Sequence, residues 1–219
     1  RDADDRVSPM HRLGVGSSWA SRRANHAHAN LACRIGCRHG LLSQAAPDVV
    51  IDLPLVLYSV PKFTGYSLEP AVVSQLVSEH ENVVGVKDSG GSIATIAEII
   101  RLVGDKISVL AGTADVALPT LMLGGRGAVV AVANAFPRMC SSLYKAFKRG
   151  DYEEAGKLQR QITYINEVLV KRHNQLSAIK EALKLQGLPG GYPRRPALPL
   201  EATKRKDIEN VLKDMPESS

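Results

Sequence analysis

The sequence is poor in cysteine, in aromatic side chains and in long apolar runs, and each shortage excludes a class of protein. Three cysteines in 219 residues cannot build a disulfide framework, so we expect a reducing compartment, the cytoplasm. No apolar run approaches the roughly 18 residues needed to cross a bilayer, and no charged-then-apolar signal segment opens the sequence. We therefore expect no membrane association.

The net charge of +6 is spread along the chain and does not indicate a nucleic-acid partner. Residues 51–219 carry 21 basic and 18 acidic side chains, and aromatic residues make up 5% of the sequence. Proteins that bind nucleic acid usually gather their basic residues on one face or along one helix. No such stripe occurs here, so we expect no nucleic acid.

Residues 1–50 lack lysine altogether and show neither helical nor strand periodicity. Three interpretations stay open for this segment. It could hold a metal, it could be an organellar transit peptide because it is rich in Arg and Ser, or it could be GC-rich DNA translated out of frame. We favour the last, and expect an irregular segment. The metal site would use loosely spaced ligands, namely His26, His28, Cys33, Cys37 and His39.

From residue 51 the hydrophobic pattern changes to one that predicts alternating strands and helices. Near-continuous apolar runs predict buried strands, and stretches with apolar residues three or four apart predict the helices between them. The predicted strands are 49–60, 82–87, 106–112 and 127–133, and the predicted helices are 68–80, 92–104, 114–125 and 136–150. Connections of this length suit parallel strands only, so residues 51–150 are expected to form four βα units of an α/β fold.

Residues 151–219 are predicted to form a helical extension. Asp151 and Glu154 have the spacing of a capping box, and one apolar stripe follows from Ala155 to Leu169. A second stripe contains Leu176, Ile179 and Leu183, and a last helix is expected around residues 208–215. These stripes are expected to be packing surfaces.

Two residues at predicted strand ends suggest chemistry. In parallel α/β folds, ligands bind at the carboxyl ends of the strands, where Tyr58 closes the first predicted strand and Lys87 the second. An amine held there in a poorly hydrated site would lose charge more readily and could attack a carbonyl to form an imine. Taken singly, Lys87 could be a surface lysine and Tyr58 a core residue.

The motifs around these two residues resemble those of the dihydrodipicolinate synthase/N-acetylneuraminate lyase family. "VLYSVPKFTG" is similar to the end of the family's fifth barrel strand, and "VVGVKDSGGS" to the end of its sixth. "VLAGTADVALPTLMLGGRGAVVAVANAFP" resembles the seventh and eighth strands in order and spacing. The resemblance covers residues 52–200 and implies strands 5–8 of a (β/α)8 TIM barrel, followed by C-terminal helices.

The resemblance also implies a mechanism and a site. Lys87 would form an imine with a 2-oxo acid such as pyruvate, and Tyr58 would transfer protons as the general acid and base. No cofactor and no metal would be needed. The remaining implied substrate-binding residues lie around these two, namely Thr64 and Gly65 in the turn after Tyr58, Ser89, Gly112 at the mouth, and Val129 on strand eight.

Two departures from the family pattern bear on the substrate. Phe63 stands where dihydrodipicolinate synthases carry an arginine that holds a carboxylate, and an apolar ring cannot form that pair. Ala114 stands where sialate lyases have an acidic residue. We therefore expect a lyase acting on 4-hydroxy-2-oxoglutarate or a 2-keto-3-deoxy sugar acid, releasing an aldehyde. The alternative is dihydrodipicolinate synthase.

The motifs of the family's first four strands are not found before Tyr58. A half barrel exposes strand edges, so the chain is expected to be poorly soluble or inactive unless a partner completes it. A catalytically inactive fragment or subunit is therefore a further alternative, and a homotetramer or dimer is expected when the protein is complete. A doubly wound nucleotide-binding domain is disfavoured, because no Gly-x-Gly-x-x-Gly turn follows the first strand.

Overall fold

The structure, a computed structural model, describes residues 53–215, and these form two compact units. The first unit contains residues 53–90 and Glu98–Val109, and the second contains Gly91–Ala97 and residues 110–215. The metal ligands and other features considered for residues 1–50 lie outside the described residues. Division of the chain into domains at residues 50 and 150 stays a prediction.

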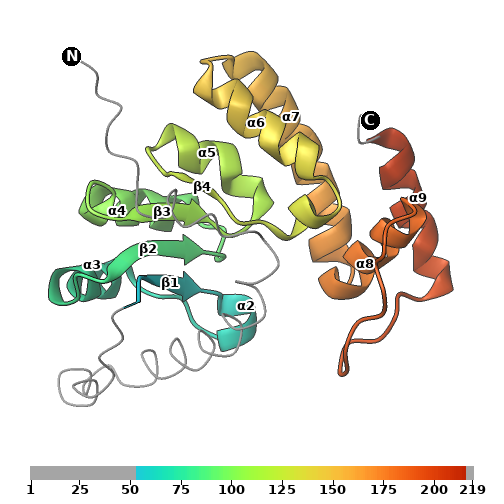
Figure 1. Ribbon diagram of the computed structural model, residues 1–219, viewed down its shortest axis with the longest axis horizontal. Coiled ribbons are helices and arrows are strands. Elements are labelled where there is room, and N and C mark those ends of the chain that lie inside the picture. The colour runs from blue at the N-terminus through green and yellow to red at the C-terminus, as the bar shows by residue number, and fades with distance from the viewer. Residues whose placement is uncertain (1–52, 216–219) are drawn as a thin grey trace. The chain divides into compact units, whose positions relative to one another are not determined.

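The first unit is built around two parallel strands (Figure 1). β1 (Leu55–Ser59) pairs with β2 (Val83–Asp88), in register from Val56 opposite Gly85 to Ser59 opposite Asp88. Their connection contains the short helix α2 (Pro61–Thr64) and the helix α3 (Pro70–Glu79). Both helices begin at a proline, which tolerates the first helical position because its missing N–H would lack a partner there.

Helix α4 (Ile93–Val103) connects β2 to β3 (Ser108–Ala111), and both elements pass from one unit to the other. The Ser92 hydroxyl accepts a hydrogen bond from the Thr95 N–H at 3.2 Å, as an N-terminal cap does. The sequence predicted this helix from apolar residues three or four positions apart, of which Ile96 and Val103 are buried and Ile93 is 38% exposed. Within the described residues the sheet has the strand order β1-β2-β3-β4.

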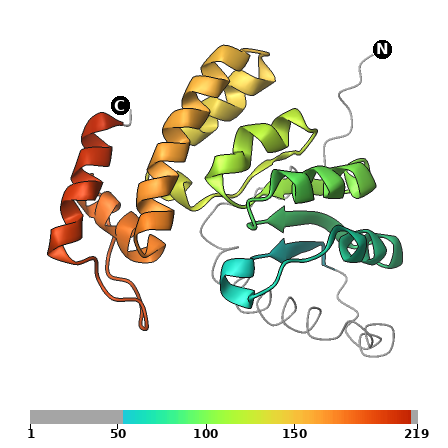
Figure 2. The same ribbon diagram turned by 180° about the vertical axis from the view of Figure 1, so that it is seen from behind.

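The second unit consists mainly of helices. Its elements after β3 are the 3-10 helix η2 (Ala114–Val116), α5 (Ala117–Met122), β4 (Gly127–Ala128), the 3-10 helix η3 (Ala131–Asn134), α6 (Pro137–Lys148), α7 (Tyr152–Asn166), the π-helical turn η4 (Glu167–Arg172), α8 (Gln175–Leu185) and α9 (Ala202–Asp214). β4 is parallel to β3. Helices α6 and α7 lie side by side in both views (Figures 1 and 2).

The core of the second unit gathers the apolar faces of these helices. Phe136, at the start of α6, is fully buried, and Ile162 and Ile165 of α7 are buried with it. α9 contributes Ile208 and Val211. Burying a side chain of this size stabilises the fold by roughly 1.5–3 kcal/mol. The helical extension is therefore packed onto its neighbours mainly by the predicted stripe from Ala155 to Leu169 and by the buried residues of α9.

One half of the predicted capping box of α7 is confirmed, since the Asp151 carboxylate accepts a hydrogen bond from the Glu154 N–H at 3.1 Å. The Asp151 N–H donates to the Ala146 carbonyl at 3.0 Å and not to Glu154. Leu176, in contrast, was expected in the stripe of α8 but is 51% exposed. The small residues Ala178 and Ala182 are buried there instead. The prediction was based on the larger apolar residues, whereas α8 packs against its neighbours through the small residues Ala178 and Ala182.

The fourth predicted strand, 127–133, is wrong in its length. β4 ends at Ala128, and the chain then forms η3, whose Val132 is fully buried. The Asn134 side chain donates to the Ala131 carbonyl at 2.9 Å and closes this turn. A short apolar run does not distinguish a buried strand from a buried helical turn, which explains the error.

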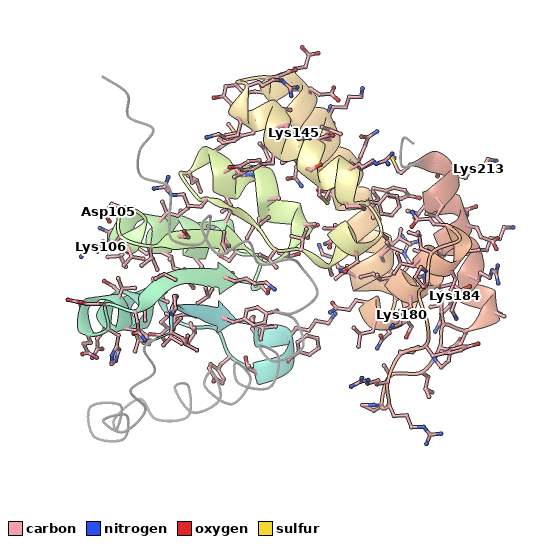
Figure 3. All side chains as sticks on the ribbon, in the orientation of Figure 1. Asp105, Lys106, Lys145, Lys180, Lys184 and Lys213 are labelled. Carbon is pink, nitrogen blue, oxygen red and sulfur yellow. The ribbon has the colours of Figure 1, made fainter. Side chains whose placement is uncertain are left out.

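The loop after α8 is held against that helix by two of its lysines, both labelled in Figure 3. Lys180 Nζ donates to the Gly190 carbonyl at 2.8 Å. Lys184 Nζ lies 4.1 Å from the centroid of the Tyr192 ring. None of the helices in the described range is long and apolar enough to cross a bilayer.

Candidate active site

The parallel register of β1 and β2 places Tyr58 directly opposite Lys87. In a parallel pair, residues opposite each other present their side chains on the same face of the sheet. Lys87 Nζ accordingly lies 4.2 Å from the centroid of the Tyr58 ring. An ammonium at this distance from a phenol ring is attracted by the negative face of the ring. The two residues singled out from the sequence are therefore neighbours, and both are partly buried.

Ser89 joins this pair from the loop after β2. Its hydroxyl lies 3.5 Å from the Tyr58 hydroxyl, a long contact, and its backbone N–H donates to the Ser59 carbonyl at 2.8 Å. The second bond extends the β1–β2 ladder by one residue beyond Asp88 and fixes the start of the loop. Tyr58, Lys87 and Ser89 thus form one cluster at the carboxyl end of the two strands.

Thr64 and Gly65 form the turn that follows β1. The Thr64 hydroxyl approaches two backbone carbonyls, those of Tyr66 at 2.8 Å and Val60 at 3.2 Å. Gly65 adopts φ = +81°, a left-handed conformation that glycine reaches without steric cost, and its N–H donates to the Pro61 carbonyl at 2.9 Å. These bonds give both residues a role in shaping the turn. Direct contact of Thr64 and Gly65 with a substrate stays a prediction.

Sequence reasoning missed two buried polar residues behind the cluster, Ser59 and Asp88. Each follows a site residue in its strand, so their side chains point to the opposite face of the sheet. The Ser59 hydroxyl accepts from the Leu68 N–H at 3.2 Å, and an Asp88 oxygen accepts from the Gly90 N–H at 2.9 Å. Both anchor the loops that carry the site. The sequence signal that could have revealed them is a pair of polar residues at the end of each apolar strand, "YS" in β1 and "KD" in β2.

Gly112 and Val129 belong to the second unit and lie level with each other where β3 and β4 end. The Val129 N–H donates to the Ala111 carbonyl at 2.8 Å, which extends the β3–β4 pair by one residue. Val129 was expected on the strand itself. It follows β4 and its side chain is 51% exposed. Its backbone still continues the pairing, so its place beside the end of β3 does not depend on the strand assignment.

A buried hydrogen-bond network, also unforeseen, holds the segment after Gly112. The side chain of Gln159 on α7 binds the backbone of η2 and of the first turn of α5, and Asn166 Nδ2 donates to an Asp115 oxygen at 2.8 Å. Lys171 Nζ lies 2.6 Å from the other Asp115 oxygen. The hydrogen bond to Asp115 raises the pKa of Lys171, because it stabilises the ammonium form.

No group of three or more His, Cys, Asp or Glu residues within residues 53–215 is arranged to hold a metal ion. The cluster itself offers an amine, a phenol and the Ser89 hydroxyl. An amine beside a phenol is a pair suited to imine formation on a carbonyl compound.

Comparison with known proteins decides the family. The model described as "Dihydrodipicolinate synthetase family" matches residues 46–215. The chain belongs to this family.

Members of the dihydrodipicolinate synthetase family related to this chain include a 4-hydroxy-tetrahydrodipicolinate synthase of Archaeoglobus fulgidus. It is 34% identical over 75% of this chain and 56% of its own length. The synthase of Citrifermentans bemidjiense is 35% identical over 78% of this chain and 58% of its own length. The chain therefore spans a little over half the length of these curated relatives.

Solved structures of the family share the fold. The prophage protein YagE of E. coli K12, solved in complex with pyruvate, has a TM-score of 0.71 and 31% identity, and the match covers 77% of this chain and 58% of YagE. A dihydrodipicolinate synthase structure from Thermus thermophilus, described as putative, has a TM-score of 0.64 and 36% identity, over 74% of this chain and 57% of that one. The chain has the parallel α/β fold of this TIM-barrel family, of which the described residues form a part.

Proposed function

We propose that this chain belongs to an enzyme that forms a Schiff base between Lys87 and pyruvate or a related 2-oxo acid. The observation that carries the proposal is the position of Lys87 Nζ, 4.2 Å from the centroid of the Tyr58 ring, on neighbouring strands in register. The family supports it, and a family structure has been solved with pyruvate. No cofactor is required for this chemistry.

The neutral Lys87 amine attacks C2 of the 2-oxo acid, and loss of water leaves an imine. Once protonated, the imine accepts the electron pair of the C3–C4 bond, while the proton of the C4 hydroxyl passes to Tyr58. The aldehyde leaves, and an enamine remains on Lys87. Protonation at C3 followed by hydrolysis releases pyruvate and restores the amine. The same steps in reverse join pyruvate to an aldehyde.

Two aldehyde partners are supported by different observations. The related proteins are named 4-hydroxy-tetrahydrodipicolinate synthase, which favours the condensing direction and makes the synthase the better supported candidate. Phe63 favours the lyase, because it lies on α2 next to Thr64 and is 69% exposed where the synthases are expected to carry an arginine. The lyase candidates are 4-hydroxy-2-oxoglutarate and 2-keto-3-deoxy-sugar-acid aldolases.

We further propose that the chain supplies strands 5–8 of the barrel and that Thr64, Gly65, Ser89, Gly112 and Val129 line the substrate site. When the barrel is complete, the protein is proposed to form a homo-oligomer, a tetramer or a dimer. A chain without the other strands is expected to turn over slowly or not at all. An inactive subunit is the corresponding alternative.

The assay that tests the function uses both directions. The full chain is incubated with 4-hydroxy-2-oxoglutarate and, separately, with pyruvate and a carboxylate-bearing aldehyde, and pyruvate release or consumption is followed. Lys87→Ala is expected to abolish either activity. Phe63→Arg is expected to shift the ratio of the two toward condensation if the lyase is correct. Activity that persists in Lys87→Ala rejects the Schiff-base function.

A further inference from the structure

We propose that Gln159, Asn166 and Lys171 are positioning residues that fix the loop after β3 at the substrate end of the sheet. This inference rests on the proposed function, because that loop begins with Gly112. All three residues lie outside the sequence motifs that identified the site. They come from α7 and from η4, which follows it, and all their contacts with the loop lie within the second unit.

Gln159 holds the main chain of the loop from both sides. Its Oε1 accepts a hydrogen bond from the Leu118 N–H at 2.8 Å, at the beginning of α5. Its Nε2 donates to the Ala114 carbonyl at 2.9 Å and approaches the Asp115 carbonyl at 3.3 Å. One side chain therefore caps the start of α5 and satisfies carbonyls of η2, the kind of groups that helix ends leave without partners.

The hydrogen bonds of Gln159 are expected to contribute to stability because they are buried. Gln159 is 9% exposed, and Ala114 and Leu118 are also buried. A buried backbone group that loses its partner pays the full cost of desolvation, since water cannot replace the lost hydrogen bond. Gln159 Nε2 also lies 3.0 Å from the Thr163 hydroxyl, one turn along α7, which holds the amide in its orientation.

Asp115 gives the loop a second attachment. Both of its carboxylate oxygens are engaged, one by Asn166 Nδ2 at 2.8 Å and the other by Lys171 Nζ at 2.6 Å. Asn166 is buried, whereas Lys171 is 54% exposed at its side chain. The backbone and the side chain of the same short segment are thus held by residues that lie more than 40 positions later in the sequence.

The loop also touches the segment that follows the catalytic lysine. A methyl group added at Gly91, four residues after Lys87, would lie 3.3 Å from Cγ2 of Thr113. Gly91 has φ = +76°, so its backbone is held in a conformation that other residues rarely adopt. Movement of the β3 loop would therefore disturb the loop after β2, and misplacement by about 1 Å can cost a reaction about a hundredfold.

The test uses the full chain, two test variants each with a matched control, and one conservative variant. Gln159→Leu removes the bonds to the main chain, and Gln161→Leu makes the same change two positions away on α7. Lys171→Met removes the ion pair with Asp115, and Lys157→Met removes the exposed lysine that faces Glu154 at 3.7 Å. Lys171→Arg keeps the charge and should retain the parent behaviour. Lys171 is largely exposed, so these variants should fold even if Gln159→Leu does not.

The first readout is amide hydrogen exchange of the peptide covering residues 112–118. We expect exchange there to quicken in Gln159→Leu and Lys171→Met, while exchange in β1 and β2 stays at the parent rate. Unchanged exchange at 112–118 in folded variants overturns the proposal. This readout needs no activity, so it decides whether the network holds the loop even if the chain forms no imine.

The second readout is reductive trapping of pyruvate by borohydride. A loss of folded protein would lower the amount trapped without moving the pyruvate concentration that half-saturates trapping. A positioning role predicts that this concentration rises about tenfold or more in Gln159→Leu and Lys171→Met, but not in the two controls or in Lys171→Arg. If amide exchange at residues 112–118 quickens but the pyruvate concentration for half-maximal trapping does not change, the claim that the network positions the substrate site is overturned. Absence of an adduct in the parent chain rejects the proposed function for this chain and favours the inactive subunit.

Discussion

Tyr58 and Lys87 are register partners on parallel strands, and the lysine amine lies 4.2 Å from the centroid of the tyrosine ring. The ring and the hydroxyl of Tyr58 can therefore serve different purposes. The ring provides a face for the ammonium form of Lys87, and the hydroxyl is the group that can carry a proton. A substitution that separates these two roles tests each of them.

Tyr58→Phe keeps the ring and removes the hydroxyl. We expect imine formation with pyruvate to persist, because the amine and its ring neighbour remain. Carbon–carbon cleavage should fall by about 10² to 10⁴-fold, the usual contribution of a positioned proton donor. Parallel measurement of trapping and of turnover separates the two effects. Full turnover in Tyr58→Phe would show that another group transfers the proton.

Gly65→Ala tests the turn after β1. An added methyl group would meet no atom within 4 Å, so any loss comes from the left-handed backbone at φ = +81°. We expect the free energy of unfolding to fall by about 1–2 kcal/mol. Gly156→Ala is the matched control, because Gly156 lies inside α7 and its added methyl group would make an ordinary 3.6 Å contact with Arg160.

Gly156→Ala should raise the free energy of unfolding by up to about 1 kcal/mol, since alanine favours a helix interior. Urea denaturation of both variants measures the difference. Equal effects of the two substitutions would show that the turn at Gly65 does not require the left-handed conformation.

Lys171→Met should change how stability depends on alkaline pH. The Asp115 hydrogen bond raises the pKa of Lys171 above its ordinary value of 10.5 in the folded chain. A raised folded pKa stabilises the fold fully below pH 10.5, and this stabilisation disappears as the pH rises through the folded pKa. The parent should therefore be more stable than Lys171→Met below pH 10.5, and the two should converge above it.

Denaturation midpoints measured between pH 8 and about 11.5 follow this convergence. Lys157→Met provides the baseline for removing an exposed lysine from the same region. A constant difference between parent and Lys171→Met across this range would mean that the ion pair with Asp115 adds no pH-dependent stability.

Asp151→Ala tests the start of α7, the helix that carries Gln159. The Asp151 carboxylate accepts from the Glu154 N–H, and loss of such a cap costs about 1 kcal/mol. Glu153→Ala removes a carboxylate from the same turn, where no capping bond is formed, and should cost less. Thermal melting of the two variants compares them. Equal losses would assign the effect to charge alone.

The sequence predicted best those elements whose periodicity and end signals agree. Helix α4 has both, with Ser92 at its beginning and Gly104 after its end, and its position follows from them. The pairing of Tyr58 with Lys87 follows from two apolar strands that end in polar residues. Consecutive parallel strands bring those ends together at one edge of a sheet.

The remainder depends on packing that a linear pattern does not contain. Gln159 is a polar residue without a motif on α7, and only the folded chain brings its amide to Leu118, 41 residues away. Within the π-helical turn η4, the neighbours Val168 and Leu169 are both buried.

The account depends most on Lys87 being the residue that binds a 2-oxo acid covalently. The direct measurement is borohydride reduction of the full chain with pyruvate, followed by peptide mass mapping of every lysine. We predict a single adduct on Lys87, absent from Lys87→Ala and retained in Lys106→Ala, which removes an exposed lysine in the turn before β3. An adduct that persists in Lys87→Ala, or a parent chain that forms none, would contradict the account.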